Sequence, residues 1–118
     1  MRTLLLFGDS NTHGTPPVPD LGASGRFPRE ERWATRLARL LPDWEVIAEG
    51  QPGRTTVHDD PIEGPHRNGL TVLPALLDSH QPVDVVLIML GTNDLKERFS
   101  VNAGDIALAL ERLVRVIR

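Results

Sequence analysis

The chain has 118 residues, a formal net charge of −3 and a sequence pI of about 5.7. This acidic balance gives no electrostatic reason to expect a nucleic-acid partner. The lack of cysteine excludes a disulfide framework and thiolate chemistry. No apolar run approaches the ~20 residues of a membrane-spanning helix. An apolar segment follows the first residues at once and leaves no room for a signal peptide, so we expect a cytoplasmic protein without membrane contact.

The first half of the chain predicts a strand, a loop, a helix and a second strand. Residues 3–7 are uniformly apolar, as in a strand that is buried on both faces. Residues 12–27 are rich in glycine and proline, which predicts a long irregular loop. Residues 29–41 place apolar side chains on one helical face, and Pro42 ends that helix. Residues 45–49 predict the second strand.

The second half repeats this order and adds a final helix. Residues 54–68 predict a second long loop, residues 70–80 a helix and residues 84–90 a third strand. Apolar residues recur at helical spacing after Asn102, which is a suitable N-cap residue with Asp105 three positions later. Strands that alternate with helices indicate an α/β protein with a parallel sheet and helices on both of its faces.

Each predicted strand runs into a polar turn that contains glycine. The turns are residues 8–11 (Gly-Asp-Ser-Asn), residues 49–56 and residues 91–94 (Gly-Thr-Asn-Asp). The carboxyl ends of parallel strands lie at one edge of a sheet, so these turns predict a site at that edge. Ser10 follows the first strand, where it fits either a catalytic nucleophile or an ordinary helix N-cap.

The three turns resemble the first three sequence blocks of the GDSL or SGNH hydrolases, in order and across the whole chain. The arylesterase and acyltransferase branch is the most similar, since it has close equivalents of residues 54–56, 59–61 and 88–94. The resemblance implies a three-layer α/β/α, flavodoxin-like fold with the first strand between the second and the third. It also implies a small ester as substrate and no cofactor.

By the same resemblance, Ser10 is the nucleophile of an ester hydrolase. The backbone amides of Ser10 and Gly53 and the side-chain amide of Asn93 then hold the oxyanion. The residue types suit these roles, because glycine lets the acyl oxygen approach closely and asparagine donates a hydrogen bond at any pH. The expected reaction is hydrolysis of short-chain or aryl esters through an acyl-serine, with acyl transfer to an alcohol as an extension.

The family's late Asp-x-x-His block does not occur in this sequence. Residues 1–118 therefore resemble the N-terminal portion of one domain, with about three of five strands of a flavodoxin-like sheet. We expect this portion alone to be nearly inactive, because a serine hydroxyl needs a base. We also expect exposed Val85 and Leu87 to promote association, either between copies or with the missing C-terminal segment.

Several charged residues in the turns have a structural interpretation. Asp9 and Asp94 are expected to hold their loops by accepting backbone hydrogen bonds rather than to act as acids or bases. Arg54 follows Gly53 directly and is expected to orient a loop carboxylate such as Asp59 or Asp60.

The four histidines do not match the family's base. His13 would have to fold back to reach Ser10, His58 and His66 belong to the second loop, and His80 ends a helix. No histidine pair has metal-ligand spacing and the acidic residues do not form a cation-binding loop, so we expect no metal.

Two other functions fit parts of the pattern. A flavodoxin-like module could bind phosphate or a nucleotide with the same turns, although no Gly-x-x-x-x-Gly-Lys sequence is present. A catalytically silent half-domain that serves only in binding or assembly would explain the missing base.

Overall fold

The computed structural model describes residues 1–17 and 25–118. The chain forms two compact units: the first joins Met1–Pro52 to Pro82–Met89, and the second joins Gly53–Gln81 to Leu90–Arg118. Part of the loop predicted at residues 12–27 lies outside the described residues.

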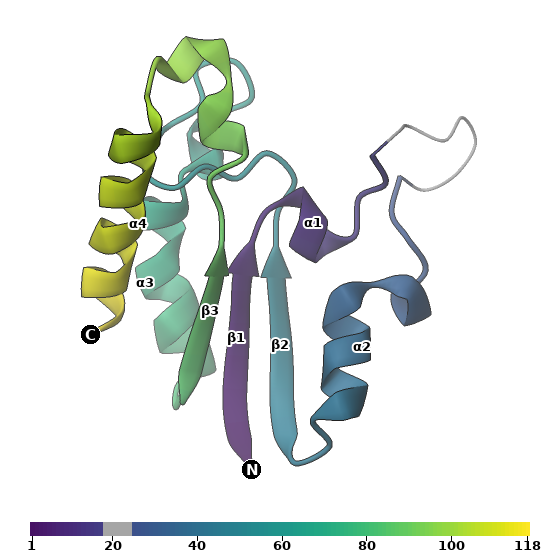
Figure 1. The fold of residues 1–118 in the computed structure, drawn as a ribbon. Helices are drawn as coiled ribbons and strands as arrows, with labels where there is room; N and C mark the ends of the chain where they lie inside the picture. The colour runs from purple at the N-terminus through teal and green to yellow at the C-terminus, as the bar shows by residue number, and fades with distance from the viewer. Residues whose placement is uncertain (18–24) are drawn as a thin grey trace. The chain divides into compact units, whose positions relative to one another are not determined.

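The first unit contains a parallel sheet of three strands, β1 (Arg2–Gly8), β2 (Trp44–Gly50) and β3 (Val85–Met89). Their order is β2-β1-β3 (Figure 1), which confirms the prediction that the first strand lies in the middle. Gly8 pairs with Gly50 on one side and with Met89 on the other. The three strands therefore end at the same level, and the turn that carries Ser10 leaves the sheet at that edge.

The core of the first unit follows from the apolar run in β1. Leu4, Leu5, Leu6 and Phe7 are all buried, as predicted for a central strand. On one face of the sheet, Leu4 and Leu6 pack against Ala34 of helix α2 (Trp33–Leu40). The partly buried side chains around this cluster are Trp33, Leu37, Leu41, Trp44 and Val46.

The predicted helix at residues 29–41 is shorter in the structure. Arg29–Glu31 forms a 3₁₀ turn, Arg32 is extended, and α2 begins only at Trp33. The three residues of the turn are charged and contribute no buried side chain, so no apolar contact holds them in an α-helix. Arg32 instead donates a hydrogen bond from Nε to the carbonyl oxygen of Phe27 at 2.9 Å.

A second correction concerns the start of the first predicted loop. Thr12 and His13 are helical, because the short helix α1 spans Ser10–His13. Gly14 ends the helix with a φ of 93°, a conformation that glycine adopts without steric cost.

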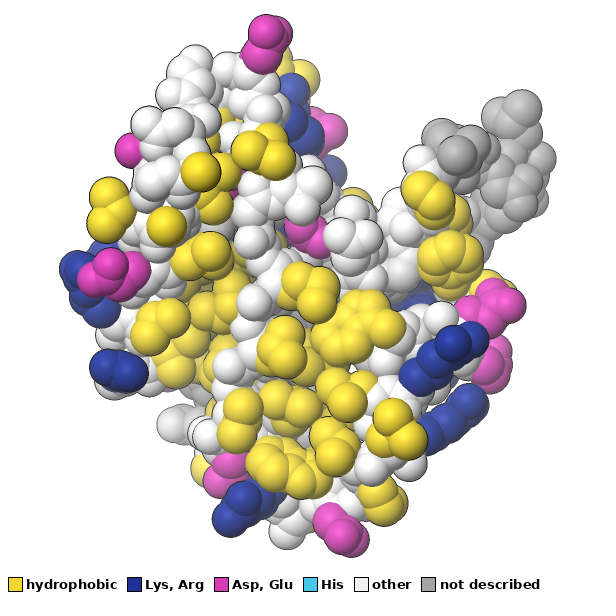
Figure 2. Space-filling model, viewed as in Figure 1, with side chains coloured by type: hydrophobic (Ala, Val, Ile, Leu, Met, Phe, Trp, Pro, Cys, Tyr) yellow, Lys and Arg dark blue, Asp and Glu magenta, His cyan; other side chains and the backbone are white. Residues whose placement is uncertain are grey.

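Part of the sheet surface in the first unit is apolar and exposed. Val85, Leu87 and Met89 alternate along β3 with exposed fractions of 45%, 36% and 42%. Figure 2 shows hydrophobic side chains gathered over the strands on this side of the molecule. The predicted exposure of Val85 and Leu87 is thereby confirmed.

The second unit contains helices α3 (Gly69–His80) and α4 (Ala103–Ile117), which pack against each other. Asn102 caps α4 as predicted: its Oδ1 accepts from the Asp105 amide at 2.9 Å, and Asp105 Oδ2 accepts from the Asn102 amide at 3.1 Å. Three short 3₁₀ turns complete the unit, at Pro65–Arg67, Asn93–Leu95 and Glu97–Phe99.

Candidate active site

Ser10 is the first residue of α1, directly after the turn that ends β1. Asp9 is the N-cap, and its Oδ1 accepts a hydrogen bond from the amide of Asn11 at 3.1 Å. This bond confirms the structural role predicted for Asp9. Within the described residues of the first unit, the hydroxyl of the half-buried Ser10 makes no hydrogen bond.

Close backbone packing fixes the position of α1 against the strand ends. A Cβ atom on Gly8 would lie 2.1 Å from Thr12 Oγ1, and one on Gly50 would lie 2.3 Å from the amide nitrogen of His13. Both distances are far shorter than any real contact, so only glycine fits at these two strand ends. The short helix that begins with Ser10 can therefore sit directly against β1 and β2.

His13 lies on the same short helix and is turned to a local partner. Its Nδ1 is 3.1 Å from Thr15 Oγ1. Burial, helped by the nearby positive charges of Arg26 and Arg32, lowers the pKa of His13 from its ordinary value. The ring is therefore more often neutral near pH 7 than an exposed histidine.

Gly53 begins the second unit and has a backbone conformation that favours glycine. Its φ is 79°, a left-handed conformation that is strained for other residues. A Cβ atom there would lie 2.9 Å from both Arg67 Nη1 and Glu63 Oε2. Within the described residues of its unit the Gly53 amide donates no hydrogen bond. The space beside Gly53 is therefore bounded by an ion pair, which the sequence did not indicate.

Asn93 is connected to the same segment by a long-range hydrogen bond. Its Nδ2 donates to the carbonyl oxygen of Arg54, the residue after Gly53, at 3.1 Å. This bond uses one of the two N–H groups on Nδ2 and leaves the other. The structure thus links two of the predicted site residues, Gly53 and Asn93, within one unit, whereas Ser10 belongs to the other unit.

Asp94 anchors the second loop from inside the unit. It is fully buried, its Oδ1 accepts from the Thr56 amide at 3.0 Å, and its Oδ2 accepts from the Thr56 hydroxyl. These bonds confirm the structural role predicted for Asp94. His58 Nε2 lies 3.6 Å from the same Oδ2, and the His58 ring stacks on Phe99 with centroids 5.2 Å apart.

Asp60 is the second buried anchor, and its partner is Arg98. Arg98 donates from Nε at 2.9 Å and from Nη2 at 2.8 Å, one bond to each carboxylate oxygen. The amides of Ile62 and Glu63 add bonds of 2.9 and 3.0 Å to Oδ1. The hydrogen bonds from Arg98 hold the pKa of Asp60 well below its usual range, against the opposing effect of burial.

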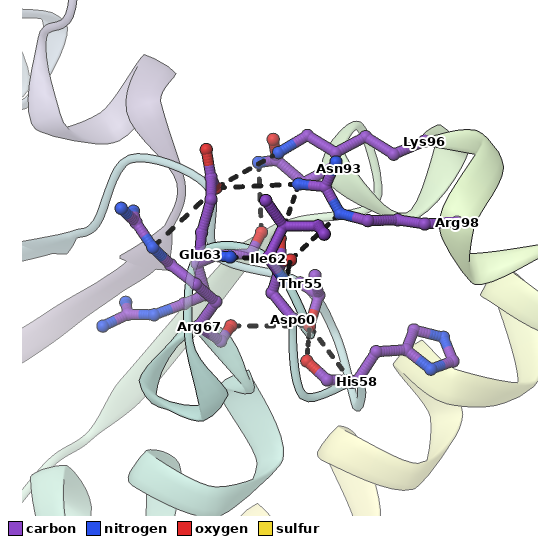
Figure 3. A network of polar contacts seen from close by, with 10 residues as sticks. Thr55, His58, Asp60, Ile62, Glu63, Arg67, Asn93, Lys96 and Arg98 are labelled. Atoms are coloured by element: carbon purple, nitrogen blue, oxygen red, sulfur yellow. Dashed lines mark hydrogen bonds and ion pairs between the residues drawn. The ribbon is translucent and has the colours of Figure 1, made fainter.

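Glu63 is shared by three cations in the network of Figure 3. Its Oε2 lies 3.4 Å from Lys96 Nζ, 3.9 Å from Arg98 Nη2 and 4.0 Å from Arg67 Nε. We call Glu63, Arg67 and Lys96 the charged rim of Gly53. No pattern in the sequence indicates this rim, because its residues lie up to 33 positions apart and share no period.

The described residues contain no group of three or more histidine, cysteine, aspartate or glutamate side chains that could hold a metal ion. None of the helices in the described ranges has the length and apolar character needed to cross a bilayer.

A family model described as the GDSL-like Lipase/Acylhydrolase family matches residues 6–118. The chain belongs to this family. The family resemblance predicted from the three turns is thereby confirmed.

The proteins to which the chain is similar include esterases of known sequence and structure. An arylesterase from Vibrio mimicus is 41% identical over 92 residues, which are 77% of this chain and 37% of that protein. The inhibitor-bound aryl esterase of M. smegmatis is 45% identical with a TM-score of 0.91, covering 98% of this chain and 54% of that one. A carbohydrate acetylesterase family member from Sinorhizobium meliloti is 43% identical with a TM-score of 0.90, covering 100% and 54%.

These matches confirm the predicted fold class, an α/β fold of the SGNH hydrolase type. The chain spans about half the length of the solved relatives that it matches.

Proposed function

We propose that the full-length gene product containing these residues is a carboxylic ester hydrolase that works through an acyl-serine intermediate. The observation that carries this proposal is the hydrogen bond from Asn93 to Arg54, which holds a neutral donor next to the backbone of Gly53. Family membership and the position of Ser10 at a helix start support it.

The reaction begins at Ser10. Its Oγ forms a bond to the carbonyl carbon of the ester while the hydroxyl proton passes to a general base. The tetrahedral intermediate then collapses, the bond to the leaving alcohol or phenol breaks, and that group takes up the proton. Water attacks the acyl-serine in the same way and releases the acid. The base is the histidine that the family resemblance assigns to the absent Asp-x-x-His block.

Hydrogen-bond donors for the developing oxyanion are the backbone amides of Ser10 and Gly53 and the free N–H of Asn93. Such a donor contributes most when it is already oriented before reaction. The Arg54 carbonyl supplies this orientation to Asn93, and the left-handed backbone of Gly53 fixes the direction of its amide. Removal of one donor of this kind costs about 3 kcal/mol in the transition state.

The activities named for the relatives guide the choice of substrate. Two of them are aryl esterases and one is a carbohydrate acetylesterase family member. We therefore propose esters with short acyl chains on aryl, alkyl or sugar-like alcohols. Transfer of the acyl group to an alcohol in place of water is a further proposed reaction of the same intermediate.

The test uses the full-length gene product, an aryl acetate and a fluorophosphonate probe. We expect the probe to modify Ser10, as located by peptide mass spectrometry, and Ser10→Ala to lower turnover by about 10⁶-fold. Ser79 is an exposed residue of α3, so Ser79→Ala is the matched control and should leave turnover unchanged. Wild-type turnover by Ser10→Ala would show that the nucleophile is wrongly assigned. A correctly folded, unlabelled protein without turnover would favour the silent half-domain.

A further inference from the structure

The charged rim of Gly53 lies where the proposed function places the reacting ester. Arg67 Nη1 and Glu63 Oε2 would each be 2.9 Å from a Cβ on Gly53. Lys96 Nζ joins them through its 3.4 Å contact with the same Glu63 oxygen. A substrate group on this side of Gly53 would therefore meet Arg67 and Glu63, with Lys96 next to Glu63.

The rim has more positive charge than its carboxylate can neutralise. The surrounding network contains three cations, Arg67, Lys96 and Arg98, but only two carboxylates among the described residues, Asp60 and Glu63. Arg98 makes a two-bond pair with Asp60, which is buried and also accepts two backbone amides. Glu63 alone remains for the other two cations.

The hydrogen-bonding capacity of the rim is also incomplete. Among the described residues, the buried Nε of Arg67 has no hydrogen-bond partner, and its 4.0 Å separation from Glu63 is too long for one. An arginine offers five donors and a lysine three. The side chains of Arg67 and Lys96 are 22% and 32% exposed, so a ligand can reach both. Because the Nε atom itself is covered, a ligand would meet the other donors of these two side chains, and a carboxylate matches the planar guanidinium group best.

We propose that Arg67 and Lys96 are specificity-determining residues that bind a carboxylate on the substrate, outside the ester bond that is cleaved. The preferred substrates are then esters that carry a negative charge on the acid or the alcohol portion. Glu63 holds the two cations in place and competes with the substrate for them. This inference rests on the proposed function, which supplies the ester and the reaction.

The test compares two aryl acetates that differ in one charge, 4-acetoxybenzoate and its methyl ester. Each loses the same acetyl group, so the ratio of their kcat/KM values reports the effect of the carboxylate. Any difference in leaving-group reactivity cancels when this ratio is compared between the wild-type protein and a variant. The measurements are made on the full-length gene product at low ionic strength, where charge effects are least screened.

We expect Arg67→Gln and Lys96→Gln each to lower the anionic-to-neutral ratio about two- to fivefold, the range for partly exposed charge pairs. The change should be in KM more than in kcat. Glu63→Gln should raise the ratio, because it removes the competing carboxylate. Arg115→Gln is the matched control, since Arg115 is exposed on α4 and pairs with Glu111 of the same helix. An unchanged ratio in both Arg67→Gln and Lys96→Gln, or a lower ratio in Glu63→Gln, would overturn the proposal.

A binding measurement keeps this inference separate from the proposed function. The side-chain Nε–H signal of Arg67 is followed by NMR during titration with 4-hydroxybenzoate and then with its methyl ester. We expect a shift with the anion alone, and no such shift in Lys96→Gln at the same concentration. If the protein hydrolyses no ester, the proposed function fails, and this titration still decides whether the rim binds a carboxylate. Equal shifts with both compounds, or no shift with either, would contradict the proposal that Arg67 and Lys96 bind a carboxylate.

Discussion

The two units hold their polar turns in opposite ways. In the first unit, the Ser10 turn depends on partners nearby in the sequence, such as Asp9 with the amide two residues later. In the second unit, Asn93 bonds to a residue 39 positions away, and Asp94 and Asp60 each bond to residues 38 positions away. The Asp9 hydrogen bond can form as soon as its own turn does, whereas each long-range bond requires two distant segments of the second unit to come together.

The largest expected effect concerns the catalytic base, which neither unit is expected to provide. The sequence contains no Asp-x-x-His block, which carries the family's catalytic base. We therefore expect the 118-residue chain alone to hydrolyse aryl acetates at least ~10³-fold more slowly than the full-length gene product. Addition of a C-terminal segment that carries this block, in cis or as a separate chain, should restore turnover. Strong esterase activity of the 118 residues alone would contradict this, and would make a histidine such as His13 or His58 the base.

The next largest effect concerns association of the isolated 118-residue chain, which we expect to depend on the first unit and not on the second. The exposed β3 residues belong to the first unit, and we expect them to drive concentration-dependent association of the 118-residue chain. Leu87→Lys should reduce this association, as measured by analytical ultracentrifugation. Leu108→Lys on α4, where Leu108 is 64% exposed, is the control in the second unit. A monodisperse, cooperatively melting wild-type monomer would count heavily against this prediction.

Loss of a long-range anchor should cost the most stability. We expect Asp94→Ala to lower the free energy of unfolding by about 3 kcal/mol, because it leaves the buried amide and hydroxyl of Thr56 without an acceptor. Urea denaturation measures this value. Asp105→Ala is the control: it removes the exposed carboxylate that accepts from the Asn102 amide in the capping box of α4, and it should cost at most about 1 kcal/mol. A loss for Asp94→Ala no greater than that of the control would show that the anchor is unimportant.

Acid should weaken the other long-range anchor. The folded-state pKa of Asp60 lies below its usual range, so the ionised carboxylate stabilises the fold at pH values above the unfolded pKa of about 4. This contribution is lost as the pH falls from there through the folded-state pKa. The difference in unfolding free energy between the wild-type protein and Asp60→Asn should therefore shrink between pH 6 and pH 2. A difference that does not change with pH would exclude this linkage.

The smallest expected effect is at the local turn. Asp9→Ala removes the acceptor of the Asn11 amide, and the loss of this N-cap bond should lower the free energy of unfolding by about 1 kcal/mol. Asp9→Asn keeps an acceptor at this position and is the matched control. If Asp9→Ala cost as much as Asp94→Ala in the same urea measurement, the contrast between local and long-range turns would be wrong.

The same contrast explains which features could be predicted from the sequence. The backbone hydrogen bond to Asp9 and the Asn102–Asp105 cap were predicted correctly because both partners lie within three residues, whereas the N-cap interpretation of Ser10 was wrong, since Asp9 occupies that position. The apolar run in β1 likewise identified the central strand. The extended residue Arg32, which separates the 3₁₀ turn from α2, was not predicted. Helical periodicity shows which residues share a face, but not whether the charged residues before them make apolar contacts.

The environment of the candidate site was predicted less completely. Ser10, Gly53 and Asn93 could be selected by family resemblance, and their catalytic roles remain predictions. The Asp60–Arg98 pair and the charged rim of Gly53 left no pattern in the sequence, because ion pairs between distant residues follow no period. The structure shows Arg98 as a partner of Asp60, and the expectation that Arg54 orients a loop carboxylate such as Asp59 or Asp60 stays a prediction.

The central position of β1 has a consequence for synthesis on the ribosome. Leu4 pairs with Val46 on one side and with Val85 on the other. Of these three strands, the one that is synthesised first therefore waits for its second partner until the third has been made. At a rate of about 5–20 residues per second, the interval between the two pairings lasts roughly two to eight seconds. During that time one edge of the nascent hydrophobic strand is open to chaperones and to neighbouring chains.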